Sequence, residues 1–187
     1  MWKILKQIVR TGLVTEPAPN AEPRLLEHAL HADIHRLFGR ALCIRQVDAG
    51  SCNGCELEIH ALSNAYYNLE GLGIKFVASP RHADALLVTG PVSKHMADAL
   101  RRTYEATPEP KLVIAVGDCA ACGGVFGEDS YAGLGRIANV IPVDVTVPGC
   151  PPTPTALLQG ILAALQSPTS RVDKRSASTY QKTEDRG

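Results

Sequence analysis

Residues 112–119 read LVIAVGDC, and residues 143–150 read VDVTVPGC. Each stretch is a short β-prone run that ends in a tight turn with a glycine and a cysteine. A run of four to eight such residues bounded by Gly or Pro is typical of a strand. A run that is apolar throughout is typical of a strand buried on both faces of a parallel sheet. The first stretch therefore predicts a core strand and the second, which contains Asp144 and Thr146, predicts a strand; each is followed by a turn that carries a thiol.

Other parts of the chain repeat this alternation of short strands and longer helices. Three further strands are expected at Ala41–Val47, Ile74–Ala78 and Ala85–Thr89. Helices are expected at Glu56–Leu69, Ser93–Ala106 and Thr153–Leu165, the last two capped by Ser93 and Thr153. A helical apolar stripe from Leu25 to Phe38 ends at Gly39. The pattern predicts an α/β fold: a flavodoxin-like, doubly wound parallel sheet with helices on both faces and an N-terminal helical extension.

The composition is that of one globular domain. The chain has 187 residues, 45% of them hydrophobic, and its 19 basic residues balance 19 acidic ones. Because this charge balance creates no global field, nucleic acid is not expected as a partner. No apolar run approaches the ~18 residues needed to span a bilayer. We expect an amphipathic helix and Pro-rich linker over 1–23, a single α/β domain over 24–166, and a flexible polar tail over 167–187.

The N-terminal segment Met1–Leu13 is a basic amphipathic pattern with two interpretations. Such a helix could dock on its own domain, or it could lie against a membrane surface or a membrane subunit, where Trp2 and basic residues are favourable. The segment lacks the long apolar core of a secretory signal, so a cytosolic location is expected.

Six cysteines are the most informative residues. Disulfides are rare in reducing surroundings, which makes metal or cluster ligation the leading explanation. Four of the cysteines follow carboxyl ends of expected strands, and in a parallel sheet these ends share one edge, where doubly wound proteins place their ligands. These four thiols can therefore converge: Cys52, Cys55, Cys119 and Cys150.

Several chemistries are consistent with these thiols. A thioredoxin-type dithiol at Cys52 and Cys55 would leave Cys119 and Cys150 without a role. A structural zinc ion could take four thiolates, although such sites usually occur in small modules that need the metal to fold. A 4Fe-4S cluster also takes four cysteines, and unliganded buried cysteines remain the fourth alternative.

Four motifs together resemble one family of redox subunits. They are Ser51-Cys-Asn-Gly-Cys-Glu56, Ser79-Pro-Arg-His-Ala-Asp84, Gly117-Asp-Cys119 with Gly123-Gly124, and Val147-Pro-Gly-Cys-Pro-Pro-Thr-Pro154. Over about residues 41–165 the chain resembles the small subunit of membrane-bound nickel-iron hydrogenases, including formate hydrogenlyase. It also resembles the homologous 20 kDa (B) subunit of NADH:quinone oxidoreductase.

The resemblance implies one 4Fe-4S cluster held by Cys52, Cys55, Cys119 and Cys150, adjacent to a catalytic large subunit. The complex I branch typically has two adjacent cysteines at the first position, whereas two residues separate Cys52 from Cys55 here, as in the hydrogenase branch. The implied partners are that large subunit, a ferredoxin-like iron-sulfur subunit and membrane subunits of the complex. The implied location is peripheral, on the cytoplasmic face of the inner membrane.

These considerations predict an electron-transfer subunit, because no dinucleotide fingerprint, phosphate loop or nucleophile–base set accompanies the cysteines. A hydrogenase or formate hydrogenlyase is favoured over a complex I-like NADH:quinone oxidoreductase. A zinc-stabilised interaction module is the alternative of another class.

The remaining polar residues of the motifs have two interpretations each. Cys43 is expected to be a small buried hydrophobe, and Cys122 a non-ligand by the family pattern. Glu56 either complements the helix dipole or, as the resemblance implies, relays protons. Arg81 and His82 are surface charges or contacts to the cluster or large subunit, and His60 is a solvated or packed side chain.

Overall fold

A computed structural model describes residues 22–127 and 130–166, together with residues 2, 6 and 10. Apart from those three positions, the expected N-terminal helix lies outside the described residues, as do most of the linker and the tail at 167–187. The last two residues of the expected linker already belong to helix α2, Glu22–Phe38. Among the helices that are described, none has the length and apolarity to cross a membrane.

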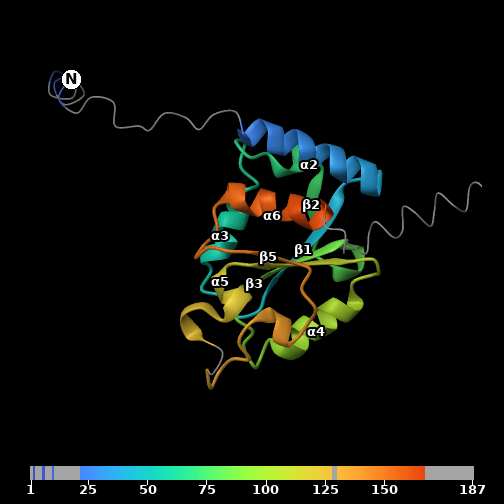
Figure 1. The fold of residues 1–187 in the computed structure, drawn as a ribbon, viewed down its shortest axis with the longest axis vertical. Coiled ribbons are helices and arrows are strands. Elements are labelled where there is room, and N and C mark those ends of the chain that lie inside the picture. Colours follow the sequence, from blue (N-terminus) through green and yellow to red (C-terminus); the bar gives the residue numbers. More distant parts are fainter. Residues whose placement is uncertain (1, 3–5, 7–9, 11–21, 128–129, 167–187) are drawn as a thin grey trace, which may run out of the picture.

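Five parallel strands form the sheet at the centre of the molecule (Figure 1). Their spatial order is β2-β1-β3-β4-β5, which is the flavodoxin-like doubly wound order. The expected fold class is therefore confirmed. The strands are β1 Leu42–Asp48, β2 Ile74–Phe76, β3 Ala85–Thr89, β4 Leu112–Val116 and β5 Val145–Val147.

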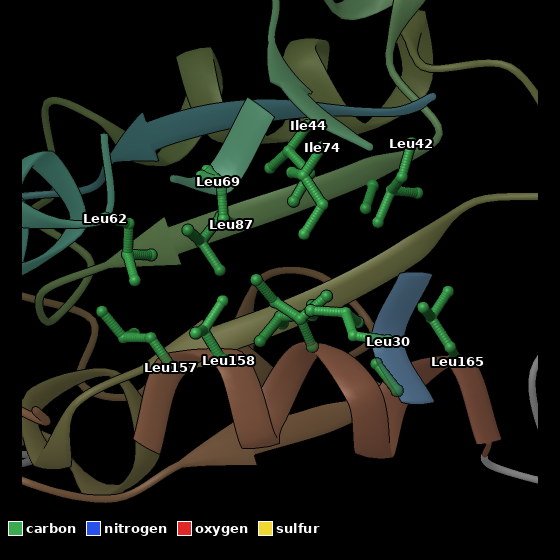
Figure 2. Close-up of a cluster of buried hydrophobic side chains, with 14 of the residues drawn as sticks. Leu30, Leu42, Ile44, Leu62, Leu69, Ile74, Leu87, Leu157, Leu158 and Leu165 are labelled. Carbon is green, nitrogen blue, oxygen red and sulfur yellow. The ribbon is translucent and has the colours of Figure 1, made fainter. Parts of the chain in front are cut away.

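Helices cover both faces of the sheet (Figure 1). Helices α2, α3 (Gly54–Ala61) and α6 (Pro154–Gln166) pack on one face, where Leu30, Ile59 and Leu158 join the strand side chains (Figure 2). Helix α4 (Ala97–Ala106) covers the other face through Ala97 and Leu100. Every residue of β3 and β4 is buried, as expected for strands enclosed on both sides.

Two expected helices are shorter than the apolar pattern suggests. The first ends at Ala61, because the Asn64 side-chain oxygen accepts the backbone N–H groups of Tyr66 and Tyr67 at 2.8 and 3.0 Å, a local turn that competes with the helix. The second begins at Ala97 and not at Ser93. The Ser93 hydroxyl accepts the Met96 amide at 3.3 Å, as expected of a cap, but residues 94–96 form a turn, and the Ser93 amide donates to the Ala49 carbonyl at 2.8 Å, just beyond the end of β1.

The cap of α6 was predicted from the sequence, whereas a short additional helix was not. Thr153 caps α6 as expected, with its hydroxyl accepting the Ala156 amide at 3.3 Å. One short helix, α5 (Asp118–Cys122), was not anticipated. Its five residues are too few to show a helical period.

Candidate functional site

One cavity at the carboxyl ends of the strands gathers four of the six cysteines. It has a volume of about 110 Å³ and is lined by Cys52, Cys55, Cys119 and Cys150, with Ser51, Gly54, Gly90, Asp118, Gly149 and Pro151. The first two thiols follow β1, the third follows β4 and the fourth follows β5. The sheet edge thus brings together the thiols of three separate loops, as the strand pattern predicted.

The loop before Cys52 is ordered by a single carboxylate. The Asp48 side chain accepts the backbone N–H groups of Gly50 at 2.8 Å and Ser51 at 2.7 Å. Asn53, directly before α3, has φ = 70°, a left-handed conformation that asparagine tolerates better than most residues. These two features turn the chain so that Cys52 and Cys55 both reach the cavity.

Backbone hydrogen bonds join the other two cysteine loops to each other. The Gly117 amide donates to the Val147 carbonyl at 2.8 Å, and the Asp118 amide donates to the Gly149 carbonyl at 2.9 Å. The β4–β5 ladder therefore continues past the strand ends, up to the residues that precede Cys119 and Cys150.

Two glycines leave room for the sulfur atoms. A Cβ built on Gly117 would lie 2.7 Å from the Cys55 Sγ, and one on Gly124 would lie 2.6 Å from the Cys119 Sγ. Both residues have positive φ, +87° and +54°, which glycine adopts without strain. At these two positions the backbone lies closer to the thiols than a residue with a Cβ would permit.

The thiols also influence one another electrostatically. Burial, followed by the nearby charges of Glu56, Cys52, Cys119 and Cys150, raises the pKa of Cys55 to about 11. Burial is also the largest cause that raises the pKa of Cys119, assisted by Cys150, Cys52 and Asp118 and opposed by a hydrogen bond from the Val125 backbone. A bound cation would offset this crowding of negative charge, because metal binding replaces thiol protons and stabilises the thiolates.

The donor set fits a sulfur-rich cofactor. Four thiolates are soft ligands that select zinc, copper(I) or iron-sulfur clusters. Within the described residues, no group of three or more His, Cys, Asp or Glu side chains is arranged to hold a single metal ion. The thiols instead border a cavity, with glycine backbone pressed against two of them.

The other two cysteines lie outside this cavity. Cys122 is exposed, and its Sγ donates to the Asp118 carbonyl at 3.2 Å. Cys43 lies in β1, near the opposite end of the sheet. It was expected to be buried but is only half-buried, and its Sγ is 3.6 Å from an Arg40 Nη atom.

The remaining motif residues are more dispersed. Glu56 is only 6% exposed at the start of α3, and neither carboxylate oxygen has a hydrogen-bond partner among the described residues. His60 is exposed on the same helix. Arg81 and His82 precede β3 and so lie at the amino end of the sheet, away from the four-cysteine cavity.

Sequence reasoning assigned no role to two carboxylates that shape the site. Asp48 and Asp118 each accept backbone N–H groups of loops that carry cysteines. A local signal was present for Asp48, because an aspartate at a strand end commonly accepts backbone N–H groups two or three residues later in a turn. Asp118 gave no such signal, because its carboxylate bonds a residue of another loop.

A doubly wound α/β protein with four cysteines at the carboxyl edge of its sheet is the class that this fold and site define. Residues 52–164 match the family described as NADH ubiquinone oxidoreductase, 20 Kd subunit. The chain belongs to this family of oxidoreductase subunits, which confirms the resemblance noted in the sequence.

Individual proteins similar to this chain are also parts of redox complexes by name. A probable membrane-bound hydrogenase subunit of Pyrococcus furiosus is 46% identical over 147 residues, covering 79% of this chain and 87% of the relative. Formate hydrogenlyase subunit 7 of Escherichia coli is 43% identical over 137 residues, 73% of this chain, which spans only 53% of that relative. A chain in the structure of an archaeal membrane-bound sulfane sulfur reductase is 32% identical, with a TM-score of 0.61 and coverage of 86% and 85%.

Proposed function

We propose that this chain is an electron-transfer subunit that carries one 4Fe-4S cluster, next to the catalytic large subunit of a membrane-bound nickel-iron hydrogenase or formate hydrogenlyase-like complex. Cys52, Cys55, Cys119 and Cys150 would hold the cluster, which supplies one-electron transfer when bound. The observation that carries the proposal is the single cavity bordered by these four thiols.

The cavity favours a cluster over the zinc alternative. Four thiolates that bind one zinc ion directly, with Zn–S distances of ~2.3 Å, close around it and leave no space between them. Here the four thiols border a cavity of about 110 Å³, and glycine at positions 117 and 124 leaves room for the sulfur atoms of Cys55 and Cys119. The Val125 amide donates to the Cys119 sulfur, and hydrogen bonds of this kind tune a cluster's potential.

Two types of complex could contain this chain, a hydrogenase or a complex I-like NADH:quinone oxidoreductase. The two residues between Cys52 and Cys55 favour the hydrogenase branch, as does the length of the match to the hydrogenase subunit, which covers 79% of this chain. A complex I-like NADH:quinone oxidoreductase is the second candidate, because a subunit of the NADH-quinone oxidoreductase of Desulfovibrio desulfuricans is 48% identical over 126 residues. Co-purification of the large subunit and inspection of its sequence for four nickel-binding cysteines would separate the two candidates.

The proposed partners are that large subunit, a ferredoxin-like iron-sulfur subunit and membrane subunits. The names of the relatives, a membrane-bound hydrogenase and a formate hydrogenlyase, support such an assembly. A peripheral position on the cytoplasmic face of the inner membrane belongs to the same proposal.

Glu56 is proposed as a proton-relay residue. Its carboxylate is buried beside the ligand Cys55 and has no partner among the described residues, so it is free to bond a mobile donor such as water. In the intact complex, Glu56→Gln should leave the cluster signal unchanged and slow turnover. Unchanged turnover would exclude the role.

Anaerobic purification followed by iron and sulfide analysis tests the cluster itself. About four iron and four sulfide per chain are expected, with a low-temperature EPR signal after reduction. Bound zinc without iron would falsify the proposal and would favour the metal-stabilised interaction module.

A further inference from the structure

A second pocket lies at the opposite end of the sheet from the four-cysteine cavity, and Cys43 is among its lining residues. Its volume is about 320 Å³, and it opens between η2 (Pro80–His82), the start of β1 and the loop before β4. The residues that line it include three cationic or titratable basic side chains: Arg40, Arg81 and His82.

The acidic groups of this pocket are already engaged within the chain. Asp84 accepts an Arg40 guanidinium N–H through Oδ1 at 2.6 Å and the Cys43 amide through Oδ2 at 3.0 Å. Glu109 is 3.4 Å from the ammonium group of Lys111. Both carboxylates are therefore neutralised by cations of the same chain.

The two basic residues of η2 have no such partner. Arg81 and His82 are exposed, and neither side chain forms a hydrogen bond or an ion pair with another of the described residues. The formal charges that line the pocket balance, but Glu109 pairs with Lys111 outside the lining, so the guanidinium of Arg81 faces the pocket without a carboxylate partner in the described part of the chain.

Neighbouring strands extend this basic character. Lys75 on β2 is exposed and pairs in register with Cys43, so both side chains are on the same face of the sheet. Arg45 follows Cys43 by two residues on that face, and its buried Nε has no acceptor among the described residues.

We propose that this pocket docks an acidic segment of a neighbouring protein subunit, with Arg81 as its principal contact. A guanidinium group binds carboxylates through paired N–H donors. The walls at Ala83, Pro108 and Pro110 suit the aliphatic part of a Glu or Asp side chain that enters the pocket. The inference rests on the proposed function, because that function supplies the multisubunit assembly.

Photo-crosslinking in the assembled complex tests the contact. With p-benzoylphenylalanine in place of His82, we expect a crosslink to an Asp- or Glu-containing peptide of one other subunit. The same probe in place of Arg36, on the exposed face of α2, is the control. Crosslinks to lipid alone, or none in excess of the control, would overturn the proposal.

Charge reversal provides an independent measurement. Arg81→Glu should weaken retention of the crosslinked subunit about tenfold during washes of rising salt, whereas Arg36→Glu makes the same charge change and should have no effect. Arg81→Lys keeps the charge but not the paired N–H donors, so it should fall between the wild type and Arg81→Glu, which separates loss of charge from misfolding. Equal retention in the three variants would contradict docking.

The iron content of the same preparations distinguishes the two proposals. A normal cluster signal with unaffected retention in Arg81→Glu would reject only the docking surface. Absence of iron in all preparations would reject the proposed function.

Discussion

Asp118 and Gly149 bind each other twice. The Asp118 amide donates to the Gly149 carbonyl at 2.9 Å, and the Gly149 amide donates to the Asp118 carboxylate Oδ1 at 2.8 Å. Each residue directly precedes a cysteine of the four-cysteine cavity. This closed pair therefore fixes Cys119 relative to Cys150, although 31 residues of chain separate the two partners.

Removal of the Asp118 carboxylate should loosen this pair. Asp118→Ala is expected to cost about 1–3 kcal/mol of unfolding free energy, because it leaves the Gly149 amide without its acceptor. It should also lower the iron content of the purified chain. Asp118→Asn keeps a side-chain oxygen and should retain more of both. Chemical denaturation and iron analysis measure the two effects.

A matched control for this prediction is Asp98→Ala on α4. That carboxylate is exposed and pairs with Arg102 across one helical turn, a type of contact that contributes little. If Asp118→Ala were no more harmful than Asp98→Ala, the loop pair would not position the cysteines.

A methyl group at Gly124 should displace a ligand. Gly124→Ala places a Cβ 2.6 Å from the Cys119 Sγ, and it also forces alanine into a left-handed conformation. Gly39→Ala carries the same conformational cost of roughly 1–2 kcal/mol, since Gly39 has φ = +61°, but its Cβ meets nothing within 4 Å. We expect both variants to lose stability and only Gly124→Ala to lose iron. Equal iron contents would show that the close approach is irrelevant to ligation.

The strands were predictable because a short continuous run of apolar residues in the sequence is enough to indicate a buried strand. β3 and β4 agree with the expected residues at both ends, and each is an unbroken buried run of five residues. Their carboxyl ends then determine where Cys119 lies and that it shares an edge with Cys52. A parallel sheet leaves few other arrangements.

Features that depend on contacts between distant segments were not predictable in this way. The Ser93 hydroxyl accepts the Met96 amide at 3.3 Å, as a helix cap does, but the Ser93 amide pairs with Ala49, and the helix begins four residues later. The role of Asp118 depends on Gly149, which lies in another loop. The pocket at Arg81 requires η2 to lie beside the start of β1.

Single substitutions should divide the six cysteines into two groups. Serine at Cys52, Cys55, Cys119 or Cys150 is expected to abolish or strongly reduce the reduced-state EPR signal, because each thiol borders the cavity. Serine at Cys43 or Cys122 should leave the signal intact, because neither residue lines it. Loss of the signal in Cys122→Ser would assign a ligand role to that exposed thiol.

The reactivity of the iron-free protein should follow the pKa of its thiols. Thiolate is the nucleophile, and burial together with neighbouring negative charge raises the pKa of Cys55 to about 11, so at about pH 8 this residue remains protonated. We expect iodoacetamide to modify Cys55 more slowly than the exposed Cys52 and Cys150, with a rate that rises until the pH approaches 11. Peptide mass spectrometry of timed samples measures the order.

The iron-loaded protein provides the contrast for this experiment. Thiolates engaged in ligation are protected, so Cys52, Cys55, Cys119 and Cys150 should become unreactive together, while the exposed Cys122 continues to react. Because a raised folded-state pKa favours the protonated thiol, the stability linked to Cys55 is complete below about pH 9 and declines toward pH 11 in the iron-free chain. Cys55→Ser should remove that decline. If Cys55 reacted as fast as Cys52 at about pH 8, burial and neighbouring negative charge would not raise its pKa in the iron-free protein.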